Sequence, residues 1–342
     1  MVSSFLICLI IAAVLTSSIA TIFKSRFFTH SIYSQSHWLH ENRISRFGGL
    51  AIVIALSIYA WLFNSEKFSE LQLILISASP LFIAGMLEDF SVHISPFLRI
   101  FAGLFGSLIF IYTTGIYLVD VDIPLFGTLP LKPIAGVVIT IMIISTMPHA
   151  FNLTDGLNGL SSGFGALAAM VMAFISYDLG DTDHFISSLA LLGAILGFWI
   201  FNISAGSVFL GDCGAYLIGH LIALLGISIC ETNPAVSIWV MVLIVAYPLV
   251  ELMVTIFRRF LGQVSIMAPD TKHFHHLLFL KITGFVTFKK VHANSLSAII
   301  ILVGCGPFYI LATQYYFSTL ACGLFFLFFT LYYLSMRKWL LY

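Results

Sequence analysis

Long apolar segments recur along the whole chain, and they constrain its fold more than any other feature. Of its 342 residues, 60% are hydrophobic and 9% are charged, whereas a soluble domain carries about 25% charged residues. A helix needs roughly 20 mostly apolar residues to cross a bilayer. The sequence therefore predicts an all-α polytopic membrane protein, with residues 1–342 forming a single integral membrane domain.

About eleven segments approach the length of a membrane span. They are 3–23, 47–63, 70–87, 98–117, 133–149, 160–177, 184–201, 213–230, 235–257, 296–313 and 317–336. No basic residue precedes the first segment, and Lys24 and Arg26 follow it. This charge order predicts an uncleaved first helix with its N-terminus outside.

The distribution of basic residues supports this topology, because Lys and Arg collect in cytoplasmic loops. Only Lys67 and Lys132 lie outside, so thirteen of the fifteen Lys and Arg residues lie inside. The same topology places the C-terminus in the cytoplasm. The formal net charge is zero and no basic patch with interleaved aromatic residues is present, which argues against a nucleic-acid partner.

A short external segment near 118–130 has the pattern of a β-hairpin. Residues 119–123 alternate with a period of two, and Pro124, Gly127 and Pro130 follow. We expect a small structural hairpin there. The five cysteines lie far apart, so a disulfide framework or a cysteine-rich zinc site is not expected.

Polar residues gather in five loops that the topology places on the cytoplasmic side: 24–46, 88–97, 150–159, 202–212 and 258–295. The candidate site residues in these loops are His40, Arg46, Glu88, Asp89, Asn152, Asp155, Asn158, Asp212, His273, His275 and His276. Because all five loops share one face of the membrane, we predict that they form one site for anions and a metal ion.

Local spacing sharpens these expectations for the acidic loops. Asn152 and Asp155 are three residues apart and share a face if the backbone is helical, although Asp155 could instead cap the next helix. Glu88 and Asp89 are adjacent, so both can face one ligand only if their helix ends there. The segment from Ser91 to Pro96 suggests that it does.

The histidine cluster allows two interpretations. Asp270 could cap a helix on which His273 and His276 share a face, and such a helix N-terminus is a plausible phosphate site. The alternative is a zinc site, because His-x-His-His offers several nitrogen ligands. Zinc needs a further ligand and usually a more regular spacing, so the phosphate site ranks higher.

Several motifs together resemble a known family. Asn152-x-x-Asp155-Gly156-x-x-Gly159-Leu160, Phe209-Leu210-Gly211-Asp212-x-Gly214 and His273-x-His275-His276 occur in the order and spacing of the polyprenyl-phosphate N-acetylhexosamine-1-phosphate transferases. This superfamily includes the enzymes that initiate O-antigen and common-antigen synthesis and the phospho-N-acetylmuramoyl-pentapeptide translocase. About eleven spans with the N-terminus outside resemble the O-antigen-initiating branch.

The resemblance implies a Mg²⁺-dependent reaction, with Mn²⁺ as an alternative, at the cytoplasmic face of the bacterial inner membrane. A polyprenyl phosphate such as undecaprenyl phosphate would attack a UDP-N-acetyl sugar and release UMP. The implied roles are metal binding by Asp212 and Asp89, or a base at Asp89. They also include nucleotide binding by Asn152, Asp155 and Asn158, diphosphate handling by the three histidines, and phosphate contacts by His40 and Arg46.

This sequence departs from the family pattern at Glu88, which is a candidate catalytic residue, because aspartate is usual there and the glutamate side chain is one methylene longer. Asn158 and the His-Phe-His-His cluster argue against a muramoyl-pentapeptide donor. UDP-GlcNAc is the default donor, with UDP-FucNAc and UDP-QuiNAc as alternatives, and a homodimer is left open. A membrane transporter and an inactive family member that serves as a partner are the competing functions.

Overall fold

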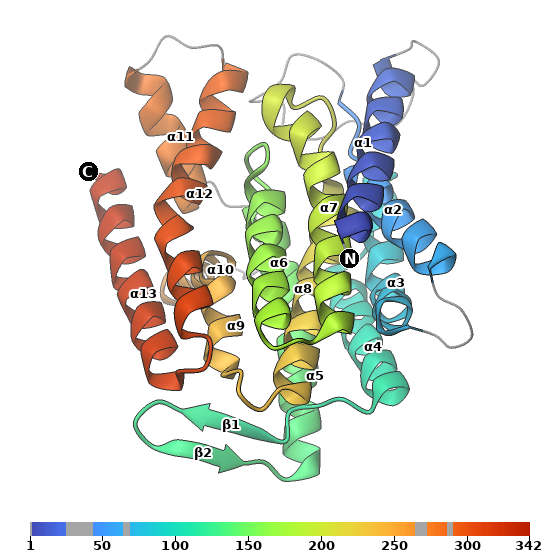
Figure 1. The fold of residues 1–342 in the computed structure, drawn as a ribbon. Helices are drawn as coiled ribbons and strands as arrows, with labels where there is room; N and C mark the ends of the chain where they lie inside the picture. The colour runs from blue at the N-terminus through green and yellow to red at the C-terminus, as the bar shows by residue number, and fades with distance from the viewer. Residues whose placement is uncertain (1, 25–43, 64–68, 264–271, 286–289) are drawn as a thin grey trace.

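The protein is described by a computed structural model that covers the chain except residues 1, 25–43, 64–68, 264–271 and 286–289. The helices are α1 Val2–Lys24, α2 Gly48–Leu62, α3 Glu70–Asp89, α4 Pro96–Thr114, α5 Pro133–Thr154, α6 Leu160–Asp178, α7 Thr182–Ala205, α8 Gly211–Thr232, α9 Ile238–Ile244, α10 Ala246–Leu261, α11 Phe274–Phe285, α12 Lys290–Tyr315 and α13 Thr319–Leu341. The strands are β1 Asp120–Ile123 and β2 Gly127–Pro130. The hairpin lies at one end of the helical bundle and α11 at the other (Figure 1).

The all-α membrane fold is confirmed. Within the described residues, nine helices are long and apolar enough to cross a bilayer, and the bent pair α9 and α10 would make a tenth. Helix α2 coincides with another expected span but has 15 residues and is therefore about 22 Å long. This is shorter than the roughly 30 Å hydrocarbon core, so the number of spans and their orientation remain predictions.

The expected span 235–257 is broken into α9 and α10, which meet at 76°. Pro248 lacks an N–H, and its ring clashes with the carbonyl four residues earlier in a continuous helix. That carbonyl, Ile244 O, accepts a hydrogen bond from the hydroxyl of Tyr309 at 2.8 Å instead. Proline therefore explains the bend, and Tyr309 satisfies the carbonyl that the bend releases.

Helix α8 forms the centre of the bundle. Its apolar 18-residue window is entirely buried, and it packs against α2, α3, α5 and α6. Glycines allow the close approach to α2, because a Cβ on Gly49 would lie 2.4 Å from Gly214 Cα. Small residues at a helix crossing let two backbones pack directly, and here they bring the N-terminus of α8 beside the start of α2.

The expected hairpin is present, with Asp120 paired to Pro130 and Ile123 to Gly127 in antiparallel register. The Asp122 carboxylate accepts hydrogen bonds from Thr128 at 2.6 Å and from Thr319 of α13 at 2.9 Å. The Trp239 indole donates to Asp122 O at 2.8 Å. These contacts attach the hairpin to α9 and α13, as expected for a structural element.

Candidate active site

Two motifs that are far apart in the sequence pair along their backbones. Ser45 and Val208 form a parallel bridge, and Phe209 N donates to Ser45 O at 2.8 Å. Gly48 N and Gly49 N donate to Phe209 O and Leu210 O at 3.0 and 2.9 Å. The segment around Arg46 is thereby held beside the first turn of α8, as one site made from these loops requires.

Asp89, the last residue of α3, caps the N-terminus of α8. Its carboxylate oxygens accept hydrogen bonds from Asp212 N at 3.0 Å and Cys213 N at 2.9 Å, and its exposed fraction is 1%. The first amides of a helix have no partner inside it and carry partial positive charge. Asp89 supplies the missing acceptor, and α3 ends at Asp89 as the sequence predicts.

Arg46 lies between the two aspartates. Its Nε is 3.3 Å from Asp89 Oδ1, and its Nη2 is 3.2 Å from Asp212 Oδ1. Burial lowers the pKa of Arg46, but Asp212, Asp89, Asp155 and Glu88 raise it, and the pKa lies above its usual value. One guanidinium group therefore faces four carboxylates.

Glu88, which also interacts electrostatically with Arg46 and Asp212, forms its ion pair with Arg99 of α4. Arg99 Nη1 contacts the two Glu88 carboxylate oxygens at 3.1 and 2.9 Å and donates to the Tyr216 hydroxyl at 3.1 Å. The same hydroxyl accepts a hydrogen bond from Asn152 Nδ2 at 3.1 Å. Sequence reasoning missed Arg99 and Tyr216 as site residues, although Arg99 is the Lys or Arg residue nearest to Glu88 along the chain.

Asn152 lies in the last turn of α5, and Asp155 is the residue that ends this helix. The residue that caps α6 is Gly159, so the alternative that Asp155 caps the next helix is wrong. Burial raises the pKa of Asp155 well above its usual value, and the neighbouring Asp212 and Asp89 raise it further against the opposing effect of Arg46. Asn158 is buried, and its backbone N–H donates to Asn294 Oδ1 at 2.7 Å.

The three histidines lie together at the start of α11. The ring centroids of His275 and His276 are 4.5 Å apart, and His273 lies 5.5 and 5.8 Å from them. The helix begins at Phe274, so His273 precedes the helix instead of sharing a helical face with His276. His275 and His276 lie against the Asp155 loop, since a Cβ on Gly156 would meet their Nε2 atoms at 2.4 and 3.2 Å.

The described parts of the chain contain no group of three or more His, Cys, Asp or Glu side chains arranged to hold a metal ion. This geometry gives the zinc interpretation no support. His40 and Asp270 lie outside the described residues. The structure otherwise brings Arg46, Asp89, Asp212 and Asp155 together, and places the histidines beside the Asp155 loop.

One further carboxylate contacts the histidine cluster and is not among the site residues predicted from the sequence. Glu251 of α10 is 1% exposed, and its Oε1 is 2.9 Å from His273 Nδ1. A lone acid within an apolar segment is the signal that could have identified it, because such residues are rare in spans and often functional.

The chain is similar in sequence to a known family of enzymes. Residues 71–230 match the family described as Glycosyl transferase family 4. The chain is 27% identical to a probable undecaprenyl-phosphate N-acetylglucosaminyl 1-phosphate transferase of Bacillus subtilis, over 70% of this chain and 67% of that protein. It is 26% identical to the undecaprenyl-phosphate alpha-N-acetylglucosaminyl 1-phosphate transferase of Yersinia pestis, over 70% of this chain and 66% of that one.

A third relative comes from cell-wall synthesis. The chain is 29% identical to a phospho-N-acetylmuramoyl-pentapeptide-transferase of Anoxybacillus flavithermus, over 64% of this chain and 72% of that protein. The matched region of each relative thus spans about two thirds of its length or slightly more. These matches confirm the resemblance of the chain to the polyprenyl-phosphate N-acetylhexosamine-1-phosphate transferases.

Proposed function

We propose that this protein transfers an N-acetylhexosamine 1-phosphate from a UDP-sugar to a polyprenyl phosphate such as undecaprenyl phosphate, and releases UMP. The observation that carries the proposal is the group of carboxylates around Arg46 at the N-terminus of α8. The names of the relatives support N-acetylglucosamine as the first sugar to test. They also favour a transferase over a transporter or an inactive partner.

In the proposed reaction, an oxygen of the lipid phosphate forms a bond to the β-phosphorus of the UDP-sugar. The bond between this phosphorus and the oxygen that bridges the two phosphates breaks, and UMP leaves with that oxygen. A phosphate monoester has a second pKa near 6, so the attacking oxygen is already ionised at neutral pH. A general base such as Asp89 is therefore not required for the attack.

The charge balance of the site supports a divalent cation. In the described part of the site, Glu88, Asp89 and Asp212 face two guanidinium groups, those of Arg46 and Arg99, which leaves an excess of one negative charge when these groups are ionised. Asp155 adds a second negative charge only when it loses the proton that its raised pKa favours. The substrates add more negative charge, and unit charges 4 Å apart repel by about 4 kcal/mol at an effective dielectric constant of 20. A cation must offset this repulsion.

Asp212 is the carboxylate that fits Mg²⁺ best. It lies in the first turn of α8, and its side chain is 16% exposed, whereas both Asp89 oxygens accept helix amides. Mg²⁺ is usually held by one or two carboxylates together with water and substrate phosphates, so a site without a full protein cage suits it. When bound, Mg²⁺ would neutralise the charge of the reacting phosphates.

The other side chains would bind and orient the substrates. Asn152, Asp155 and Asn158 would form the nucleotide side, and the histidine cluster beside Gly156 would contact the diphosphate. Arg46 would contact a phosphate of one of the substrates. Orientation of this kind accounts for a large part of catalysis when two reactants must meet.

The test is UMP release by the purified full-length protein in detergent, with undecaprenyl phosphate, Mg²⁺ and a panel of UDP-N-acetyl sugars. We expect release that needs the lipid and the metal and is lost in Asp212→Asn. The matched control is Asp183→Asn, which changes an exposed aspartate in the first turn of α7. Equal rates for Asp212→Asn and wild type, or no release with any donor from folded protein, would refute the proposal.

We place the protein in the bacterial inner membrane with the site facing the cytoplasm. The excess of Lys and Arg in the loops that carry the site supports this orientation. A reporter fused after Tyr342 should then be active in the cytoplasm. A reporter active only outside would reverse the orientation.

A further inference from the structure

The carboxylate of Glu251 is deeply buried and surrounded by hydrogen-bond donors. Its Oε1 is 2.9 Å from His273 Nδ1. Its Oε2 accepts hydrogen bonds from the Tyr333 hydroxyl at 2.5 Å and from Phe274 N at 3.3 Å. A buried carboxylate is expensive unless it is paired and hydrogen-bonded, and these contacts supply what the burial of Glu251 requires.

The broken span explains why Glu251 can reach the histidine. The bend at Val245 turns α10 by 76° away from α9, and Glu251 lies in the second turn of α10. Thr255, one turn further on, places its hydroxyl 3.4 Å from the same His273 Nδ1. Residues four apart share a helix face, so one face of α10 supports one edge of this imidazole ring.

We propose that Glu251 is a positioning residue for the transfer reaction, which fixes the orientation and the tautomer of His273. An ionised carboxylate only accepts hydrogen bonds, so His273 Nδ1 must carry a hydrogen to donate to Glu251. In the neutral ring, Nε2 is then the atom with a free lone pair. This inference rests on the proposed function, in which the histidine cluster handles the diphosphate.

The neighbouring histidine shows what the support of Glu251 adds. His275 is fully buried, and among the described residues neither of its ring nitrogens has a hydrogen-bond partner. Burial lowers the pKa of His275 well below its usual value, and His276 and His273 lower it further. His275 is therefore neutral and its tautomer is not set by a contact, whereas His273 has a defined one.

Tyr333 brings the C-terminal helix into this arrangement. It lies on α13, is 2% exposed, and its ring packs 5.2 Å from that of Phe274 at the start of α11. The Tyr333 hydroxyl binds the oxygen of Glu251 that does not face His273. Tyr333→Phe therefore removes one partner of Glu251 and leaves the contact with His273 in place.

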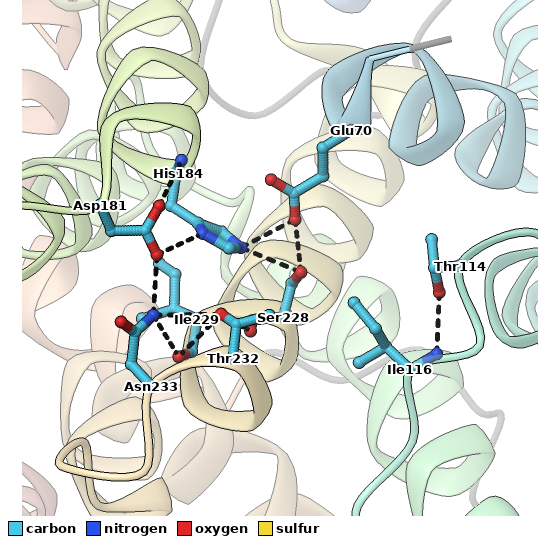
Figure 2. A network of polar contacts seen from close by, with 9 residues as sticks. All are labelled: Glu70, Thr114, Ile116, Asp181, His184, Ser228, Ile229, Thr232 and Asn233. Carbon is cyan, nitrogen blue, oxygen red and sulfur yellow. Dashed lines mark hydrogen bonds and ion pairs between the residues drawn. The ribbon is translucent and has the colours of Figure 1, made fainter. Parts of the chain in front are cut away.

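A second carboxylate–imidazole pair, at the start of α7, provides a control in which the imidazole is buried and the carboxylate is partly exposed. The carboxylate of Asp181 is 2.7 Å from His184 Nδ1, and the other ring nitrogen is 2.8 Å from Glu70 Oε1 and 3.0 Å from Ser228 Oγ. Figure 2 shows both ring nitrogens occupied in this way. His184 thus has no ring nitrogen left for a substrate, and α7, with its 24 residues, places it roughly 30 Å from the site.

The experiment compares Glu251→Gln, Glu251→Asp, Tyr333→Phe and Asp181→Asn in the full-length protein, using UMP release and thermal unfolding. We expect Glu251→Gln to lower kcat at least tenfold and to change both KM values less than about threefold, because a wrong histidine tautomer slows the reaction more than it weakens binding. Glu251→Asp should recover part of kcat. Tyr333→Phe and Asp181→Asn should keep kcat within about twofold of wild type, even where they lower the melting temperature.

Two results would overturn the proposal. One is a kcat for Glu251→Gln equal to that of wild type. The other is a loss of activity in Glu251→Gln that is fully explained by a smaller fraction of folded protein, which is the only kind of loss expected for Asp181→Asn. Failure of the proposed function itself is recognised separately, because wild-type protein would then release no UMP.

If wild-type protein releases no UMP, the tautomer of His273 can still be read directly from nitrogen-15 histidine spectra of the labelled protein. The His273 signal is identified by its loss in His273→Ala. The Nδ1–H form should be present in wild type and lost in Glu251→Gln. The same tautomer in both proteins would refute the role of Glu251.

Discussion

The two aspartates that contact Arg46 should affect different properties of the protein when their charge is removed. Asp89 has no exposed side-chain surface, whereas the Asp212 side chain is 16% exposed. Asp89 accepts two helix amides, and Asp212 contacts Arg46 alone among the contacts described for its side chain. We predict that Asp89→Asn mainly destabilises the fold, while Asp212→Asn mainly removes activity.

The magnitude for Asp89→Asn follows from its contacts. Asparagine keeps one oxygen, so one of the two α8 amides, Asp212 N or Cys213 N, would face an NH₂ group and lose its acceptor. A hydrogen bond to a charged group contributes about 1.5–3 kcal/mol, and an anion at a helix N-terminus contributes about 0.3–1 kcal/mol more. Together these losses lower the free energy of unfolding by about 3 kcal/mol.

The assay is thermal unfolding in detergent, combined with UMP release over a range of Mg²⁺ concentrations. At about 2 °C for each kcal/mol in a large domain, Asp89→Asn should lower the melting temperature by about 6 °C. Asp212→Asn should change it by less than about 2 °C, because an ion pair that solvent reaches contributes at most about 1 kcal/mol. Asp89→Asn with a wild-type melting temperature and no activity would refute the capping role and place Asp89 on the metal or substrate.

Three further predictions concern neighbouring positions. Gly211→Ala should leave little folded protein, because Gly211 has φ +77° and a Cβ there would lie 2.0 Å from Arg46 O and 2.6 Å from Asp89 Oδ2; the yield of monodisperse protein measures this. Burial raises the pKa of Asp155, so its protonated form contributes stability below its usual pKa of about 3.9, and this contribution is lost as pH rises through the raised value. Without Mg²⁺, the melting temperature of Asp155→Asn minus that of wild type should therefore increase as the pH is raised from 5 to 8. A difference that stays constant over this range would contradict the raised pKa of Asp155. His276→Ala should lower UMP release far more than His292→Ala, which changes an exposed residue of α12, and equal effects would make the cluster an ordinary loop.

Local features of this protein could be predicted from sequence because they depend on near neighbours. Apolar length predicted where the helices lie, and alternation with turn residues predicted the hairpin. The segment from Ser91 to Pro96 also predicted that α3 ends near Asp89. The bend at Val245 was missed because a window as long as a span averages over Pro248, although this proline already signalled a break.

The partners within the site could not be predicted, because they are set by contacts between distant segments. Topology alone brought the loops to one face, but it could not tell that Asp89 caps α8 or that Glu88 binds Arg99. Arg46 and Asp212 are 166 residues apart, and their contact depends on the backbone pairing of their two loops. Roles inferred from motif positions therefore treat Asp89 and Asp212 as equivalent, whereas the structure places these two aspartates in different environments.

Glu251 shows how sequence and structure could be combined in such proteins. An acid inside an apolar segment is costly to bury, so its presence implies a partner, and a proline three residues earlier implies that the segment is broken there. Together these two signals predict that Glu251 has a polar partner beside a break in the helix. The identity of the partner, His273, still required the fold, because sequence spacing does not show which side chain at the start of α11 meets Glu251 of α10.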